Sequence, residues 1–348
     1  MKSLKDVSWQ VSEEIYRADP ALSYSTLARY DREGFNNLYK LFDKIETPSL
    51  TFGSAVDSLI TGGKSEFDER FLVAEFPSIP DSIVSIVKYL FNNNSTEYSR
   101  LKDIPDNILN DAITLFNYQQ NWKPETRIKV IKEKGAEYYN LMYIANGRTI
   151  LDTETYNDVI LSVEALKTSE ATRSLFADND PYDPDTERFY QLKFKATLNG
   201  IDYRCMADEI LILHDRKVII PIDLKTSSKP EWDFYKSFIE WKYYIQAMLY
   251  WRIIRANLDN DDFYKDYRLL DYKFVVVNRK TRTPLVWDCP FTQKTGTQLL
   301  GKNKDIILRD PEDIGKELRF YLDNHYNTPI GIDINSPNNI EEWINKNL

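Results

Sequence analysis

The sequence predicts an α/β (α+β) fold in which a central mixed β-sheet is flanked by helices and interrupted by a helical insertion. Residues 190–208 alternate between apolar and polar side chains, as half-buried strands do. Residues 218–225 are almost continuously apolar, as a strand buried on both faces would be. Helical patterns run from Ser23 to about Ile60 and from about Phe234 to Ala256. Strands joined by a hairpin and followed by a helix and further strands build a mixed sheet covered by helices.

Turn residues separate the predicted strands. Asn199 and Gly200 are the strongest short hairpin signal and divide the alternating stretch into residues 190–198 and 201–208. Pro221 lies inside the third strand and has no backbone N–H, so we expect a bulge or an unpaired stretch there.

The rest of the chain is assigned to parts of the same fold. We expect two more strands at 272–278 and 285–288, followed by helices from about Thr292 to His325. The predicted organisation is an N-terminal helical part of the core at 1–63, a mostly helical insertion at 64–175, the core sheet and helices at 176–330, and a tail segment at 331–348.

The composition excludes several kinds of chemistry. The chain has 348 residues, 42% of them hydrophobic, so it can bury a large core. Two cysteines and two histidines are too few for a disulfide framework, a four-thiolate cluster or a zinc site rich in imidazole. Carboxylates and lysines are abundant, and any catalysis should therefore use hard oxygen ligands or acid–base carboxylates.

The charge balance argues against a nucleic-acid binder at first sight. The formal net charge is −9, whereas contacts to phosphate use Lys and Arg. The deficit lies elsewhere in the chain, however, because residues 186–245 contain 10 Lys and Arg against 9 Asp and Glu, a net charge of +1 that leaves −10 for the remainder. A locally cationic cleft is compatible with this distribution.

The chain carries no run of about 18 apolar residues, and its first ten residues lack the apolar stretch of a signal peptide. We therefore expect a cytoplasmic protein with no membrane segment.

Two carboxylates and a lysine are the main candidates for a site. Asp223 and Lys225 are two residues apart on a strand, so both side chains leave the same face. Asp208 lies on the preceding strand, where a neighbouring position could bring its carboxylate near Asp223. Such a pair suits Mg²⁺ or Mn²⁺, and a lysine beside it can orient a water or hold a phosphate oxygen. The alternative is a solvated strand end or a simple ion pair, but the strand should be buried, where unpaired charge is costly.

Three motifs resemble those of the RecB-like branch of the PD-(D/E)XK nuclease superfamily, especially the RecE-like phage exonucleases. They are MADEILI, IPIDLKTS and YYIQAMLY, which contain the family's Asp at Asp208, its D-x-K at Asp223 and Lys225, and its Q-x-x-x-Y at Gln246 and Tyr250. The resemblance implies a restriction-endonuclease-like core.

Two upstream segments extend the resemblance. LSYSTLARY is similar to the family's serine-bearing opening helix, and TFGSAVDSLI matches its G-x-x-x-H helix at Gly53. Asp57 replaces the usual histidine and is still a competent ligand for Mg²⁺. Its alternative is a charge on a helix surface.

The resemblance also implies roles for individual residues. Asp208, Asp223 and the carbonyl of Leu224 would bind the metal, with Asp57 as a further ligand. Lys225 would position the attacking water.

Four other residues have weaker assignments. Gln246 and Tyr250 lie one turn apart on a helix and could contact the substrate phosphate or brace Lys225, or be ordinary helix residues. Glu187 could be an additional acidic ligand or a solvated strand end, and Ser25 a phosphate contact or a helix-cap hydroxyl.

These assignments predict a Mg²⁺-dependent (or Mn²⁺-dependent) DNA exonuclease, a hydrolase that acts on linear double-stranded DNA ends in recombination or repair. The resemblance implies a phage protein in the host cytoplasm, a homo-oligomer and a single-strand annealing protein as partner. Two alternatives are an endonuclease of the same fold and a catalytically inactive DNA-binding or assembly protein.

Overall fold

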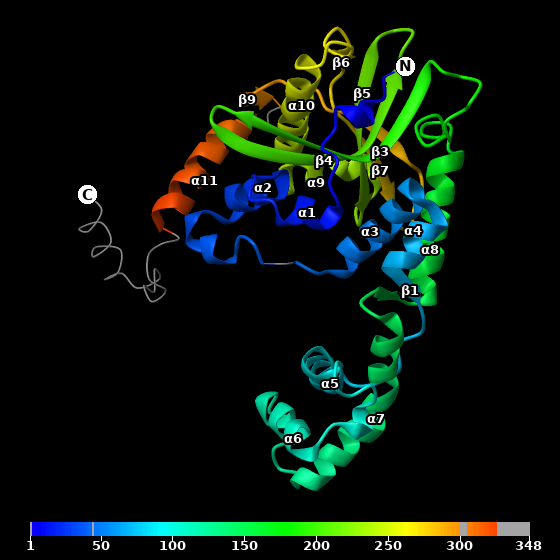
Figure 1. The fold of residues 1–348 in the computed structure, drawn as a ribbon, viewed down its shortest axis with the longest axis vertical. Helices are drawn as coiled ribbons and strands as arrows, with labels where there is room; N and C mark the ends of the chain where they lie inside the picture. Colours follow the sequence, from blue (N-terminus) through cyan, green and yellow to red (C-terminus); the bar gives the residue numbers. More distant parts are fainter. Residues whose placement is uncertain (1, 44, 300–304, 326–348) are drawn as a thin grey trace. The chain divides into compact units, whose positions relative to one another are not determined.

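The computed structural model describes residues 2–43, 45–299 and 305–325, which form two compact units. The first unit contains Met1–Gly53 and Ser162–Leu348, and the second contains Ser54–Leu161. Figure 1 shows the elements of both, coloured along the chain. Each unit is described by itself below.

A mixed sheet forms the centre of the first unit, as predicted. Its strands run in the order β3-β4-β5-β7-β8, and β6 pairs with part of β5. The β3, β4 and β5 strands are antiparallel, β5 and β7 are parallel, and β7 and β8 are antiparallel. Their bounds are β3 Thr186–Leu198, β4 Ile201–Leu213, β5 Val218–Ser227, β6 Arg268–Leu269, β7 Lys273–Asn278 and β8 Leu285–Asp288.

The hairpin between β3 and β4 turns at the predicted residues. Asn199 and Gly200 have φ angles of 49° and 81°, the left-handed pair that a two-residue hairpin turn needs. On the first strand, Gln191 also has a positive φ of 53°, and the ladder skips the position opposite Asp208. The hairpin is therefore distorted beside this candidate residue.

Pro221 lies at the point along β5 where the neighbouring strand changes from β6 to β7. β6 pairs with Val218 and Ile219, whereas β7 pairs with β5 only from Ile222 onward. On its other side Pro221 stays in the ladder, opposite Ile210 of β4, so the expected unpaired stretch is confined to the side of β5 that faces β6 and β7.

Helices cover this sheet. They are η1 Leu4–Asp6, α1 Glu13–Ala18, α2 Tyr24–Glu33, η2 Phe35–Lys40, η4 Glu231–Asp233, α9 Phe234–Glu240, α10 Tyr243–Asp259 and α11 Pro311–His325. Helix α10 packs on β3 and β4 and also contacts α2 and α11 (Figure 1). The apolar core between these elements includes Phe194, Tyr203, Met248 and Phe274.

The single helix expected from Phe234 to Ala256 is wrong in one respect. The chain breaks it at Trp241 and Lys242, and Lys242 has a left-handed backbone with a φ of 57°. A non-glycine residue in this conformation ends a helix, and α10 starts afresh in a new direction.

The helices expected from Thr292 onward are also partly wrong. Strands β9 Gly296–Leu299 and β10 Asp305–Leu308 pair antiparallel before α11 begins at Pro311. The β-branched residues of these short strands favour extended backbone. The predicted tail segment at 331–348 lies outside the described residues.

The second unit is mostly helical. It contains the end of α3 Pro48–Thr61, then α4 Gly63–Arg70, β1 Phe71–Val73, α5 Asp81–Asn94, η3 Leu101–Asp103, α6 Asp106–Leu115, α7 Pro124–Ala145, β2 Thr149–Leu151 and the start of α8 Thr153–Thr168. Helices α5, α6 and α7 share a core that includes Val87, Leu109 and Tyr139. Among the described residues, no helix is long and apolar enough to cross a membrane.

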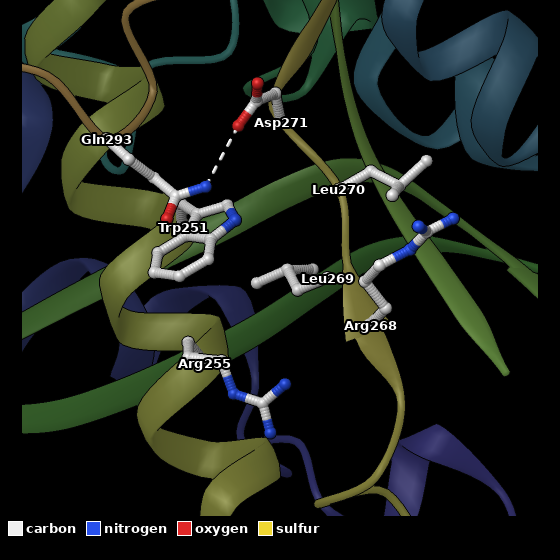
Figure 2. Close-up of a pocket in the computed structure, with 7 residues that line it drawn as sticks. All are labelled: Trp251, Arg255, Arg268, Leu269, Leu270, Asp271 and Gln293. Carbon is white, nitrogen blue, oxygen red and sulfur yellow. Dashed lines mark hydrogen bonds between the residues drawn. The ribbon is translucent and has the colours of Figure 1, made fainter.

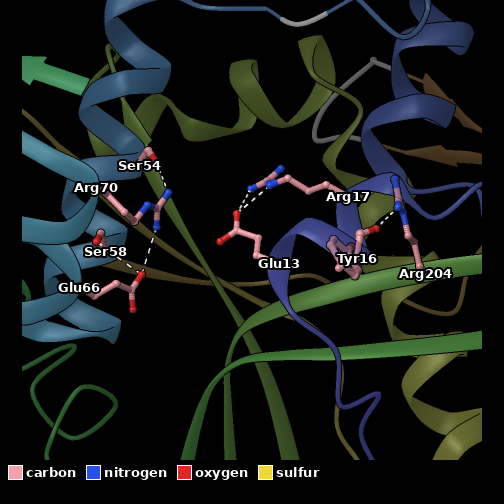
Figure 3. A network of polar contacts seen from close by, with 8 residues as sticks. All are labelled: Glu13, Tyr16, Arg17, Ser54, Ser58, Glu66, Arg70 and Arg204. Atoms are coloured by element: carbon pink, nitrogen blue, oxygen red, sulfur yellow. Dashed lines mark hydrogen bonds and ion pairs between the residues drawn. The ribbon is translucent and has the colours of Figure 1, made fainter. Parts of the chain in front are cut away.

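A small polar network ties α3 to α4 within this unit. Arg70 donates to Ser54 Oγ at 2.8 Å and to Glu66 Oε1 at 3.1 Å, as Figure 3 shows. The same figure shows α1, where Arg17 pairs with Glu13 one turn away. The contacts of Arg70 link α3 to α4, and the pair of Arg17 and Glu13 stabilises α1.

Candidate active site

The carboxylates of Asp208 and Asp223 come from neighbouring strands. The ladder between β4 and β5 ends at Glu209 and Ile222, so Asp208 and Asp223 are the next opposed pair in register. Asp208 Oδ2 accepts a hydrogen bond of 2.9 Å from the backbone N–H of Leu224. The side chain of Asp208 therefore replaces the ladder at the point where it stops, and its carboxylate lies against β5.

Asp223 is buried among polar partners. Only 1% of it is exposed. The Nε2 group of Gln246 donates to its Oδ1, and Lys225 Nζ forms a close ion pair with its Oδ2. Gln246 lies in the first turn of α10, just after the break at Lys242. The structure thus brings Gln246, Asp223 and Lys225 together.

Lys225 is held as a cation. Its Nζ lies 4.7 Å from the ring centre of Tyr243 and 5.9 Å from that of Phe274. Burial acts to lower the pKa of Lys225, but the negative charges of Asp223 and Asp208 outweigh it and raise this pKa above its ordinary value. Lys225 therefore stays protonated and suits charge stabilisation or orientation rather than proton abstraction.

Two buried tyrosines line the same region. Tyr250 packs edge-on against Tyr272, with ring centres 6.1 Å apart. Burial, followed by nearby negative groups that include Asp223, raises the pKa of both phenols well above the ordinary value. The hydroxyl of Tyr272 is buried and has no hydrogen-bond partner. Sequence reasoning missed Tyr272 and Tyr243, because nothing in the local pattern sets them apart from the other tyrosines.

Gly53, the first residue of the upstream motif, lies against β5. A Cβ atom at this position would come within 2.8 Å of Thr226 Oγ1, so only glycine allows this approach. Asp57 follows one turn later on α3 and belongs to the second unit, where its carbonyl accepts from Thr61 Oγ1 at 2.8 Å. Its role as a metal ligand stays a prediction.

Glu187 is not brought to the two carboxylates. It lies opposite Ile212, four residues along β4 from Asp208, a separation of about 13 Å at the rise of a strand. Its Oε2 lies 2.9 Å from His214 Nε2, and His214 Nδ1 lies 2.9 Å from the hydroxyl of Tyr267. Glu187 therefore has a structural partner of its own.

Ser25 is exposed at the start of α2, where its Oγ lies 3.0 Å from that of Ser23. Neither a role as a phosphate contact nor one as a cap follows from these contacts, and the phosphate contact stays a prediction.

The donors of this site fit a hard divalent cation. Asp223 contributes a buried carboxylate whose Oδ2 pairs with Lys225, and Asp208 contributes a second carboxylate on the neighbouring strand. Across the part of the chain that is described, no group of three or more His, Cys, Asp or Glu side chains is arranged to hold a metal. One or two carboxylates, with waters and substrate phosphate, are the usual donors for Mg²⁺. The backbone N–H of Leu224 donates to Asp208, whereas the carbonyl of Leu224 stays a predicted metal ligand.

A separate pocket of about 420 Å³ lies near the start of β5, away from Asp223. Figure 2 shows its lining residues, and in it Gln293 donates to Asp271 at 3.1 Å. The lining comprises Trp251, Arg255, Arg268, Leu269, Leu270, Asp271 and Gln293. None of the predicted site residues belongs to this pocket.

Comparisons with known proteins give limited information. No family model matches the chain, and no curated protein matches its sequence. Among solved structures, it is similar to a putative exonuclease from Eubacterium rectale, with a TM-score of 0.39, 11% identity, and coverage of 90% of this chain and 85% of that one. A protein named VC1899 from Vibrio cholerae matches with a TM-score of 0.14, 11% identity, and coverage of 80% and 57%.

Proposed function

We propose that the protein is a metal-dependent DNA exonuclease that hydrolyses phosphodiester bonds at the ends of linear double-stranded DNA in recombination or repair. One observation carries this proposal. Two carboxylates, a lysine held as a cation and the side-chain amide of Gln246 converge where the ladder between β4 and β5 ends. Clusters of buried charge are costly to desolvate, and they occur more often at functional sites than elsewhere.

Asp208 and Asp223 would hold the cation, with the Leu224 carbonyl and Asp57 as further ligands. A bound Mg²⁺ would supply Lewis acidity toward the phosphate and lower the pKa of a coordinated water. Gln246 keeps the carboxylate of Asp223 oriented through Oδ1. Lys225, a fixed cation at this site, would bind a phosphate oxygen or orient the attacking water.

The resemblance of the motifs supplies the remaining parts of the proposal. They are a phage origin, activity in the host cytoplasm, a homo-oligomeric assembly and a single-strand annealing protein as partner.

A second candidate function is DNA binding without catalysis. It is favoured by the pairing of both Asp223 oxygens with Gln246 and Lys225, which would compete with a metal. An endonuclease of the same fold would share the site.

Digestion of linear and of closed circular duplex DNA separates these functions. Purified protein is incubated with each substrate in Mg²⁺, in EDTA, and as the Asp223→Ala variant, with Asp202→Asn as a control at an exposed acid on β4. The exonuclease requires Mg²⁺-dependent loss of the linear form alone, abolished by Asp223→Ala and retained by Asp202→Asn.

Nicking of the circle would instead support an endonuclease. Absence of cleavage in any divalent metal, with DNA binding retained, would support the binding function. Full activity of Asp223→Ala would exclude the proposed site.

A further inference from the structure

Exposed aromatic and cationic side chains gather just beyond the C-terminal end of β5. Trp232 and Tyr235 are 66% and 41% exposed, although both are large and apolar. Lys236 lies 5.6 Å from the ring centre of Tyr235, and Lys280 is exposed on the turn between β7 and β8. We call Trp232, Tyr235, Lys236 and Lys280 the strand-end surface.

Glu231 joins the two segments that carry this surface, which are η4 with α9 and the turn between β7 and β8. Its carboxylate accepts hydrogen bonds from the backbone N–H groups of Asn278 and Thr283, each 3.0 Å, and from the hydroxyls of Thr281 and Thr283 at 2.6 and 3.1 Å. Asn278 Nδ2 also donates to the carbonyls of residues 227 and 229. The strand-end surface is therefore a fixed feature, because η4 and the β7–β8 turn are bonded to each other.

Helix α9, which follows η4 directly, packs beside the candidate active site. Phe234 stacks on Tyr243 with ring centres 5.7 Å apart and an interplanar angle of 17°. Tyr243 is the ring that lies against Lys225 Nζ. Helix α9 thus contacts the surroundings of Lys225 through Phe234, and the next residue, Tyr235, is exposed.

This combination of groups matches single-stranded nucleic acid. Exposed rings accept the flat faces of bases without regard to sequence, and neighbouring cations follow the phosphates. In a duplex the base faces are stacked on one another, so rings can engage them only where bases are unpaired. Lys236 is already paired with Asp233 at 2.8 Å, whereas the side chain of Lys280 forms no ion pair with any residue in the described ranges and is available for phosphate.

We propose that the strand-end surface binds unpaired nucleotides of a single DNA strand at the active site, with a base stacked on Trp232 and a phosphate on Lys280. This inference rests on the proposed function, since it names the form of DNA that the same site holds. It makes the bound substrate a frayed or single-stranded end rather than an intact duplex.

Binding measured in EDTA tests this without any cleavage. Fluorescence anisotropy with a 5′-labelled 16-nucleotide single strand should give an affinity about 5- to 150-fold weaker for Trp232→Ala than for the wild type, the range expected for one lost stack. Trp232→Phe should retain affinity within about threefold, because the smaller ring still stacks. Trp122→Ala, which removes a comparably exposed tryptophan from the second unit, should leave affinity unchanged.

Two probes separate stacking from charge. A strand of the same length with abasic sites should bind the wild type more weakly and should show no further loss with Trp232→Ala. Lys280→Gln should reduce the slope of log affinity against log salt by about 0.7, as expected when one phosphate contact to a single strand is lost. Circular dichroism melting checks that every variant is folded.

Equal losses on the normal and abasic strands would overturn the proposal, as would unchanged affinity of folded Trp232→Ala or a wild type that binds no single strand. These results stand apart from those of the proposed function, because they need neither metal nor hydrolysis. If the protein does not cleave DNA, it can still bind a single strand through Trp232. If it does not bind a single strand in this way, it can still cleave DNA.

Discussion

Asp223 and Glu231 are both buried carboxylates, eight residues apart on one continuous segment, yet their surroundings differ. They are 1% and 2% exposed. Glu231 accepts four hydrogen bonds from neutral backbone and hydroxyl groups. Asp223 accepts one from Gln246 and is otherwise balanced by the charge of Lys225, which pairs with its Oδ2.

The difference separates a buried carboxylate with a structural role from one that is a catalytic candidate. Burial acts to raise the pKa of Glu231, but the hydrogen bonds from Thr281, Asn278 and Thr283 outweigh it and leave this pKa below its ordinary value. Glu231 is therefore satisfied as it stands and holds two loops together. Asp223 is instead balanced by the adjacent charge of Lys225, and with Asp208 on the neighbouring strand it forms the cluster that is the candidate active site.

The largest expected effect is a difference in cleavage rate between variants of Asp223 and of Glu231. Asp223→Asn should lower the rate of cleavage of linear duplex at least about 1,000-fold, because the metal loses a charged ligand. Glu231→Gln should change the same rate by less than about threefold. Initial rates at saturating DNA in Mg²⁺ measure both, and similar losses in the two variants would contradict the distinction.

A second effect concerns stability. Asp223→Ala leaves Lys225 buried without its counter-charge, which should cost about 3–5 kcal/mol of unfolding free energy. Adding Lys225→Met removes the uncompensated charge, so the double variant should be more stable than Asp223→Ala alone. Urea unfolding in EDTA gives the values. Strictly additive losses would show that the pair is not coupled.

Glu231→Gln should cost about 1–3 kcal/mol at neutral pH, since it removes a charged acceptor of several hydrogen bonds. The folded pKa of Glu231 is lowered, so its stabilisation is present above the unfolded pKa and is lost as the pH falls through the folded pKa. Unfolding curves from pH 7 down to pH 3 should therefore converge for the wild type and Glu231→Gln. A constant difference across this range would contradict the assignment.

The smallest effect tests the contact that glycine permits. Gly53→Ala places a Cβ atom against Thr226 Oγ1 and should cost about 1–3 kcal/mol by overpacking. The double variant with Thr226→Ala should recover most of this loss, because the opposing oxygen is gone. Thermal unfolding of the two single variants and the double variant measures the recovery. Absence of recovery would mean that strain lies elsewhere on α3.

Much of the sheet was predictable because local rules determine it. The left-handed pair Asn199 and Gly200 makes a tight turn on its own, and strand alternation puts Asp223 and Lys225 on one face whatever surrounds them. The contact of Gln246 with Asp223 was harder to foresee, since it joins a strand to a helix that lies 23 residues further along the chain. The same limit explains the missed β9 and β10 strands, which are only four residues long.

The sequence by itself determined the mixed sheet and the strand that carries Asp223 and Lys225, because side-chain period and turn chemistry act over a few residues. Only the tertiary structure decided which groups surround each buried carboxylate. The partners of Glu231 lie about 50 residues away along the chain, and the Leu224 amide that meets Asp208 lies across a strand pair. Hydrogen bonds to buried charge come from whatever the fold brings near, and this spatial information is absent from any short stretch of sequence.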